Sequence, residues 1–156
     1  MSALGNAEQR AKELYAARFA GTPSVSASAP GRVELAGNHT DHQGGRTIAG
    51  AIDRRAHAFA APNGSGEVRV VMEGFGEVRM SCSDLAPRES ERATSAALVR
   101  GMAAARARSG KPLGGFDTAV ASDIPAGSGV SSSAAFEVLV GAAMRALFDR
   151  SGEPAL

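Results

Sequence analysis

The first part of the chain changes from a helical to an extended hydrophobic pattern. Asn6 is suited to cap a helix over residues 7–20, with Gln9 in the position of a capping-box partner. The stripe that repeats about every 3.6 residues comprises Ala11, Leu14, Tyr15, Arg18 and Phe19. Gly21 then marks the end of the helix. From Ser24 onward alternate positions are apolar, which predicts a strand up to Leu35.

The middle of the chain contains short runs in which apolar positions alternate. These runs predict strands at Thr47–Ile52, His57–Ala61, Val68–Met72 and Glu77–Cys82. The dipeptide Asn63-Gly64 is typical of a tight turn because both residues tolerate positive φ. We therefore expect a hairpin that pairs the second of these strands with the third.

Two helical patterns flank one further strand in the last third of the chain. Helices are predicted at Ser95–Ser109 and Ala134–Phe148, with a strand at Phe116–Val120 between them. The last helix contains few charged residues, so it is expected to be buried on most sides. Because strands and helices follow no regular alternation, the pattern favours an α+β domain over a doubly wound sheet.

Composition narrows the class of protein. A chain of 156 residues fits one domain, and 17 Lys+Arg against 16 Asp+Glu give no basic field for nucleic acid. The single cysteine, Cys82, excludes a disulfide scaffold. The apolar run Val138–Met144 is too short to span a membrane, and Met1–Arg10 shows no signal-peptide pattern. We expect a cytoplasmic protein without a membrane partner.

Glycine and serine gather between the last predicted strand and the last helix. A glycine turn before a helix start presents converging N–H groups and a partial positive charge, which together suit a phosphate group. A turn that only caps a helix would need one serine and at most one glycine, so the larger number of both in this segment favours phosphate binding. The segment matches neither a Walker A motif nor a dinucleotide fingerprint. The expected phosphate-binding residues are Gly127, Ser128, Gly129, Val130, Ser131, Ser132 and Ser133.

A second polar segment follows the first predicted strand. Asn38, His39, Thr40 and Asp41 present an amide, an imidazole, a hydroxyl and a carboxylate, a mixture that suits a polyol. Arg32 could offer a planar cation to a phosphoryl group. Two alternatives stay open, namely a solvated turn and a metal site built from its histidines and aspartate.

Together these segments resemble the GHMP kinase superfamily and, within it, the galactokinases. Residues 31–45 read GRVELAGNHTDHQGG and are similar to the signature G-R-V-N-L-I-G-E-H-T-D-Y-N-x-G. Residues 125–135 resemble the phosphate motif P-x-G-x-G-L-S-S-S-A. Residues 94–101 and 115–117 resemble the intervening helix and strand of the family. The resemblance covers nearly the whole chain.

The resemblance implies the N-terminal domain of the GHMP kinase fold, a mixed sheet with packed helices. It implies ATP-dependent phosphorylation of the anomeric hydroxyl of galactose, in which Arg32 stabilises the transition state. Sugar hydroxyls would be held at positions 38–41, ATP phosphates by Gly127–Ser133, and Mg²⁺ by Ser133.

Two departures from the signature matter for the substrate. Asn38 stands where the family usually has Glu, and His42 stands where it usually has Tyr. The first change removes a charged acceptor and leaves the sugar open, so a kinase for N-acetylgalactosamine or arabinose is an alternative. A non-catalytic galactose- and ATP-binding regulator and a phosphate-binding module unrelated to sugar are others.

The family's catalytic aspartate, second acidic Mg²⁺ ligand and third glycine-rich motif follow these segments in full-length members. We therefore expect residues 1–156 to be an N-terminal half, inactive alone, whose partner is the missing C-terminal half. Phosphoryl transfer depends mostly on the positioning of the two substrates and on the neutralisation of phosphate charge. A chain that carries only half of the site would lack both and would therefore be inactive.

Overall fold

The computed structural model describes residues 6–37 and 44–149. Its helices and strands in chain order are α1 (Ala7–Arg18), β1 (Val25–Ala36), β2 (Ile48–Pro62), β3 (Glu67–Met72), β4 (Gly76–Ser81), the short 3₁₀ helix η2 (Glu89–Glu91), α2 (Ser95–Arg108), β5 (Phe116–Ser122) and α3 (Ser132–Phe148).

The strands of the described residues form one sheet in the order β1-β2-β5-β3-β4. The pairs β1–β2, β2–β5 and β3–β4 are antiparallel, whereas β3 and β5 run parallel. The sheet is therefore mixed, as expected. β5 lies at its centre and is buried on both faces from Phe116 to Ala121.

The predicted hairpin around Asn63-Gly64 is wrong. Gly64 does adopt a φ of +67°, and the Asn63 side chain accepts a hydrogen bond from the Ser65 amide at 3.0 Å. The strands on either side do not pair, because β5 lies between β2 and β3. The two strands predicted at 47–52 and 57–61 are parts of the single strand β2.

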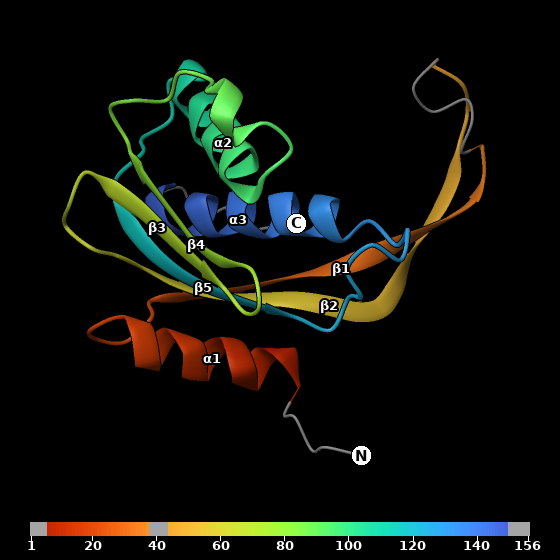
Figure 1. The fold of residues 1–156 in the computed structure, drawn as a ribbon, viewed down its shortest axis with the longest axis horizontal. Coiled ribbons are helices and arrows are strands. Elements are labelled where there is room, and N and C mark those ends of the chain that lie inside the picture. Colours follow the sequence, from red (N-terminus) through yellow and green to blue (C-terminus); the bar gives the residue numbers. More distant parts are fainter. Residues whose placement is uncertain (1–5, 38–43, 150–156) are drawn as a thin grey trace.

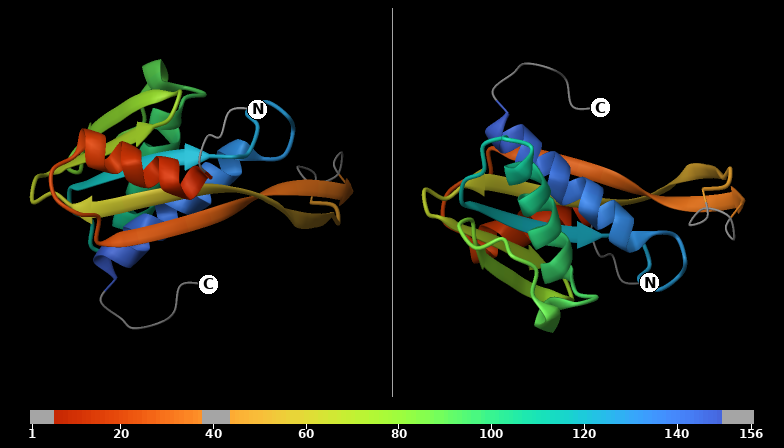
Figure 2. Two further views of the ribbon diagram at one scale, coloured as in Figure 1. Left: turned by 90° about the horizontal axis from the view of Figure 1, so that it is seen from below. Right: turned by 90° about the horizontal axis from the view of Figure 1, so that it is seen from above.

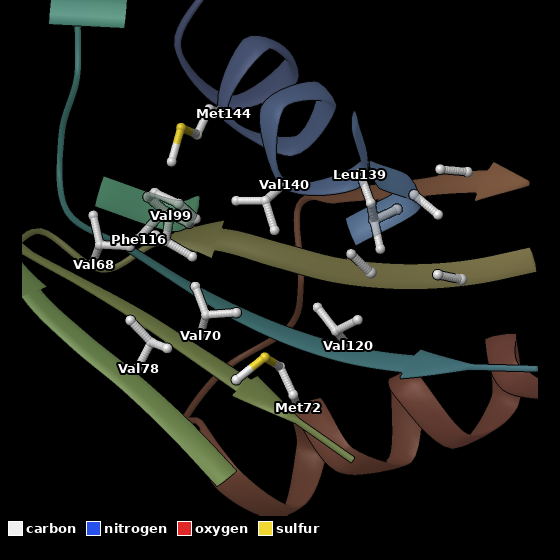
Figure 3. Close-up of a cluster of buried hydrophobic side chains, with 14 of the residues drawn as sticks. Val68, Val70, Met72, Val78, Val99, Phe116, Val120, Leu139, Val140 and Met144 are labelled. Atoms are coloured by element: carbon white, nitrogen blue, oxygen red, sulfur yellow. The ribbon is translucent and has the colours of Figure 1, made fainter. Parts of the chain in front are cut away.

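Helices cover both faces of the sheet, with α1 on one face and α2 and α3 on the other (Figure 1). The main core lies under α2 and α3, where Leu139, Val140 and Met144 face side chains of the strands (Figure 3). Alanines at alternate positions of β2 (Ala56, Ala58 and Ala60) are buried. On the other face, Tyr15 of α1 packs in a smaller cluster with Val71 and Ala119.

Local signals place α1 well. The Asn6 side chain accepts from the Gln9 amide at 3.0 Å and caps the helix as predicted. Among the described residues the reciprocal bond of a capping box is absent, and the side-chain Nε2 of Gln9 instead donates to Glu13 at 2.7 Å. α3 begins two residues earlier than predicted, and one of its faces is exposed, with Ser133, Glu137 and Val138 on it and Val138 at 64%.

The hairpin of β1 and β2 extends beyond the rest of the sheet (Figure 2). Its outer part exposes apolar side chains, with Leu35 at 70% and Ile48 at 62%. The register is irregular between Pro30 and Arg32, where residues 52–54 of β2 lie opposite Gly31 alone, at the point where the polar signature begins. In the part of the chain that the structure describes, no helix has the length and apolar character to cross a membrane.

Candidate functional site: a glycine-serine loop joined to the first strand

The loop between β5 and α3 adopts the conformation that its glycines permit. Gly127 and Gly129 have φ of +71° and +77°, and Ser131 has φ of +61°. A Cβ added to either glycine would meet no atom within 4 Å. Glycine is therefore needed at these positions for the positive φ and not for lack of space. Ser131 is in the left-handed region that non-glycine residues rarely adopt. Successive residues of opposite handedness turn their N–H groups toward one concave side, where an anion can bind.

The start of α3 is prepared for an anion. The Ser131 side chain makes no capping hydrogen bond, and the first turn contains no acidic residue. The first N–H groups of a helix have no partner within the helix, and its dipole favours negative charge there. Ser133 in this turn is exposed. A phosphate group could therefore take the place of a capping side chain.

One of the predicted serines is engaged within the loop. The Ser128 hydroxyl donates to the Pro125 carbonyl oxygen at 2.7 Å. Both of its neighbours, Gly127 and Gly129, are exposed to solvent. The Ser128 hydroxyl thus stabilises the turn, while its backbone amide stays in the run of amides that could face a ligand.

The loop contacts the first strand. The Arg32 amide donates to the Val130 carbonyl oxygen at 3.0 Å. A Cβ on Gly31 would lie 3.0 Å from the same oxygen and 2.9 Å from Cδ1 of Ile52, so a larger residue would require the Ile52 side chain to shift and the loop to give way by a few tenths of an ångström. The structure thereby brings together Arg32, predicted as catalytic, and Val130, predicted as phosphate-binding.

Arg32 has an acidic neighbour that sequence reasoning missed. Its guanidinium Nη2 lies 3.6 Å from Oε2 of Glu34, and the Glu34 side chain is 17% exposed. The other carboxylate oxygen, Oε1, is buried and has no hydrogen-bond partner among residues 6–37 and 44–149. The signal was present in the signature itself, where the family has Asn at the position of Glu34. A buried carboxylate oxygen without a donor is available to a ligand hydroxyl or amide.

The remaining predicted sugar-binding residues, Asn38, His39, Thr40 and Asp41, lie outside the described residues, as does His42. The described strands on either side of them pair up to Ala36 and Ile48.

A pocket of about 280 Å³ opens beside the serines of α3. Ser132, Ser133 and Phe136 line it from α3, and Ser95 and Leu98 line it from α2. Phe75, which is 69% exposed at the turn between β3 and β4, also borders it. Sequence reasoning missed the pocket because its walls come from segments that only the fold brings together.

Comparison with known families agrees with this arrangement. Residues 13–62 match the family model "Galactokinase galactose-binding signature". Residues 95–155 match the model "GHMP kinases N terminal domain". The first match contains the polar signature and the second contains the glycine-serine loop.

Galactokinases are among the curated relatives. The chain is 40% identical to the galactokinase of Chloroflexus aggregans over 131 residues, which are 82% of this chain and 33% of the relative. It is 35% identical to the galactokinase of Streptomyces coelicolor over 146 residues, 92% of this chain and 36% of the relative. The chain thus spans about a third of the length of the curated relatives it matches.

Solved structures share the fold. Lactococcus lactis galactokinase, in complex with galactose, matches with a TM-score of 0.79 and 28% identity, over 94% of this chain and 38% of that one. Methanococcus jannaschii mevalonate kinase matches with a TM-score of 0.68 at 17% identity, over 86% of this chain and 43% of that one. The chain thus carries, over residues 95–155, the N-terminal domain of the GHMP kinase superfamily. Within that superfamily it carries the galactose-binding signature of the galactokinases.

Proposed function

We propose that this chain supplies the sugar-binding and nucleotide-binding segments of an ATP-dependent kinase that phosphorylates the anomeric hydroxyl of galactose. The observation that carries the proposal is the hydrogen bond from the Arg32 amide to the Val130 carbonyl oxygen, at 3.0 Å. It joins the strand of the galactose-binding signature to the loop suited to phosphate. A kinase must hold its two substrates side by side, because most of its rate enhancement comes from positioning and charge neutralisation.

The nucleotide would lie along the start of α3. Backbone N–H groups of Gly127–Ser133 would bind the phosphate oxygens, and the positive end of the helix would favour their charge. The neighbouring pocket, with Leu98 and Phe136 in its walls, offers an apolar place for the base.

Mg²⁺ fits this site as a companion of ATP rather than as an ion bound by protein alone. Within residues 6–37 and 44–149 no group of three or more His, Cys, Asp or Glu could hold a metal. Mg²⁺ is commonly bound through one or two protein oxygens together with substrate phosphates. The exposed Ser133 hydroxyl would be one such ligand. When bound, the ion would neutralise phosphate charge.

The sugar would be held by the segment that joins β1 to β2. Asn38, His39, Thr40 and Asp41 would bind its hydroxyl groups, and Arg32 would stabilise the charge of the transferring phosphoryl group. Half of the Arg32 side chain is exposed, which leaves it accessible to a substrate. Residues 1–156 would be the N-terminal domain, and a C-terminal half would complete the site.

Calorimetric titration of the chain tests this function. Mg²⁺–ATP is titrated first, and galactose, N-acetylgalactosamine, arabinose and glucose are then titrated separately into the nucleotide complex. We expect dissociation constants within about 1 μM–1 mM for ATP and galactose and weaker binding of glucose. Tighter binding of N-acetylgalactosamine or arabinose than of galactose would mean that the tighter-binding sugar is the substrate. Binding of ATP with indifference to every sugar would support a phosphate-binding module and contradict the proposal.

The metal ligand has its own test. Ser133→Ala should reduce the gain in ATP affinity that Mg²⁺ brings, while ATP affinity in EDTA stays close to that of the wild type. Equal gains in both proteins would remove Ser133 as a ligand.

A further inference from the structure

α1 lies on the face of the sheet opposite α3, yet its first turn contacts the beginning of the glycine-serine loop (Figure 1). The amide of Ala7 donates to Oδ2 of Asp123 at 3.2 Å. Asp123 directly follows β5, so it is the first residue of the loop. Its own amide donates to the Arg55 carbonyl oxygen of β2 at 3.0 Å. The loop therefore begins at a residue fixed by two other elements.

Arg10, one turn further along α1, strengthens this junction. Its Nη1 donates to Oδ1 of Asp123 and its Nη2 to the Ser122 carbonyl oxygen, both at 3.1 Å. Its Nε donates to the carboxylate of Glu73 at 3.0 and 3.1 Å. The Arg10 side chain is only 15% exposed. A planar guanidinium with several fixed donors can hold three acceptors at set angles, which an ammonium group cannot.

Both ends of the loop are thus attached to other elements, while its middle is open. Asp123 is held by α1 at one end, and the Val130 carbonyl oxygen accepts from Arg32 at the other. Residues 125–129 between these points are exposed. The direction of the N–H groups in such a span depends on where its ends are held, because few other contacts constrain it.

We propose that Arg10 and Asp123, with Glu73 and Ala7, form a clamp through which α1 positions the glycine-serine loop. Arg10 is a positioning residue, since it contacts the stem of the loop and not the place where a ligand would lie. The prediction that Arg10 affects nucleotide affinity rests on the proposed function, whereas the prediction that it positions the loop does not. A purely structural role would stabilise α1 on the sheet without any particular effect on residues 124–131.

The same helix offers a matched control. Arg18 in the last turn of α1 donates to Glu77 of β4 at 2.7 Å, far along the helix from the loop. Removal of Arg18 breaks one ion pair between α1 and the sheet, whereas removal of Arg10 breaks two, with Glu73 and with Asp123. Only the Arg10 pair is connected to Asp123.

The test compares amide hydrogen exchange in the wild type, Arg10→Ala, Arg10→Lys, Asp123→Asn and Arg18→Ala, with melting temperatures measured for all. We expect exchange of peptides covering 122–131 to be about fivefold faster in Arg10→Ala and Asp123→Asn, with little change in Arg18→Ala. Arg10→Lys should recover melting temperature more fully than loop protection, because one ammonium cannot reach every acceptor. ATP affinity, measured by calorimetry, should fall with loop protection.

Two results would overturn the clamp. One is loop exchange in Arg10→Ala and Asp123→Asn equal to that of the wild type. The other is an increase spread evenly over α1 and β5 and shared by Arg18→Ala, which is the result a structural role predicts. Failure of the wild type to bind ATP would count against the proposed function alone, since the exchange data still decide whether the clamp exists.

Discussion

The amide of Arg32 donates to the carbonyl oxygen of Val130 at 3.0 Å. The first residue belongs to a strand that leads into a polar signature, and the second to a glycine-serine loop before a helix. This bond brings the two segments into direct contact, as the proposed function requires. Gly31, the residue before Arg32, shows how closely the strand approaches the loop, because a Cβ on Gly31 would lie 3.0 Å from the Val130 carbonyl oxygen.

Gly31→Ala should weaken ATP binding. The added methyl group would push against the Val130 carbonyl, a backbone atom that can yield only if the loop moves. Displacements of this kind in a binding loop reduce affinity or rate, here by about tenfold. Calorimetry with ATP measures the effect. Gly50→Ala in β2 is the control, since a Cβ there meets no atom within 4 Å. Equal affinities in the two variants would show that contact between β1 and the loop is unimportant for binding.

Gly127→Ala should also lower ATP affinity, for a conformational reason. Gly127 has a φ of +71°, where a residue with a Cβ is disfavoured by about 1–2 kcal/mol. The loop would relieve this strain by turning its N–H groups away from the phosphate. Gly110 at the end of α2 has a φ of +69° and equally open surroundings, so Gly110→Ala is matched in strain. Both variants should lose similar stability in urea unfolding. Only Gly127→Ala should lose affinity, and a loss in both would refute the assignment.

Thr118→Val should stabilise the protein. Thr118 lies in the central strand with no exposed surface, and its hydroxyl oxygen has no hydrogen-bond partner in the described part of the chain. Replacing an unpaired buried hydroxyl with a methyl group of similar shape should raise the free energy of unfolding by about 1 kcal/mol. The same substitution at Thr94 should act in the opposite direction, because its hydroxyl caps α2 and donates to the Glu91 carbonyl oxygen at 2.6 Å. Denaturation midpoints of the two variants should therefore move apart, and a loss of stability in Thr118→Val would contradict this assignment.

The free energy of unfolding should decrease at acidic pH, because an ion pair between η2 and α2 is lost there. Hydrogen bonds from Arg100, at 2.6 Å from both Nε and Nη2, lower the pKa of Glu91 below its usual range. Since the folded pKa lies below the unfolded one, this stabilisation is present above the ordinary glutamate pKa and is lost as pH falls through the folded value. Urea unfolding between pH 6 and about pH 3 should show a shallower decline for Glu91→Gln than for the wild type. Parallel declines would mean that the pair adds no acid dependence.

Local features of the fold could be predicted from sequence. Asn6 was predicted as a cap and caps α1, and the glycines of residues 127–129 were predicted to permit a turn and adopt positive φ. Such features depend on neighbouring residues alone. Strand pairing does not, and the turn at Asn63-Gly64 is real although its flanking strands lie on either side of β5. Turn chemistry sets a local reversal, whereas burial of β5 on both faces decides the order of strands.

The site was predictable where it follows a motif and not where it depends on packing. Arg32 and Gly127–Ser133 were predicted as site residues from their segments, and those roles stay predictions; the structure shows that the two segments are in contact through the Arg32 amide and the Val130 carbonyl oxygen. The clamp of Arg10 and Asp123 was missed because its members are distant in sequence and their residue types are common on surfaces. The 280 Å³ pocket was missed because its lining comes from five elements, β2, β3, α2, β5 and α3, and from the loops beside them.

A ¹⁵N–¹H correlation spectrum of the chain, titrated with Mg²⁺–ATP and then with galactose, tests the central claim most directly. We predict that ATP shifts the amide signals of residues 126–135 and that galactose then shifts those of Arg32–Leu35 and the start of β2. Saturating shifts confined to other elements, or no shift at any ATP concentration up to several millimolar, would contradict the assignment of this loop as the nucleotide site.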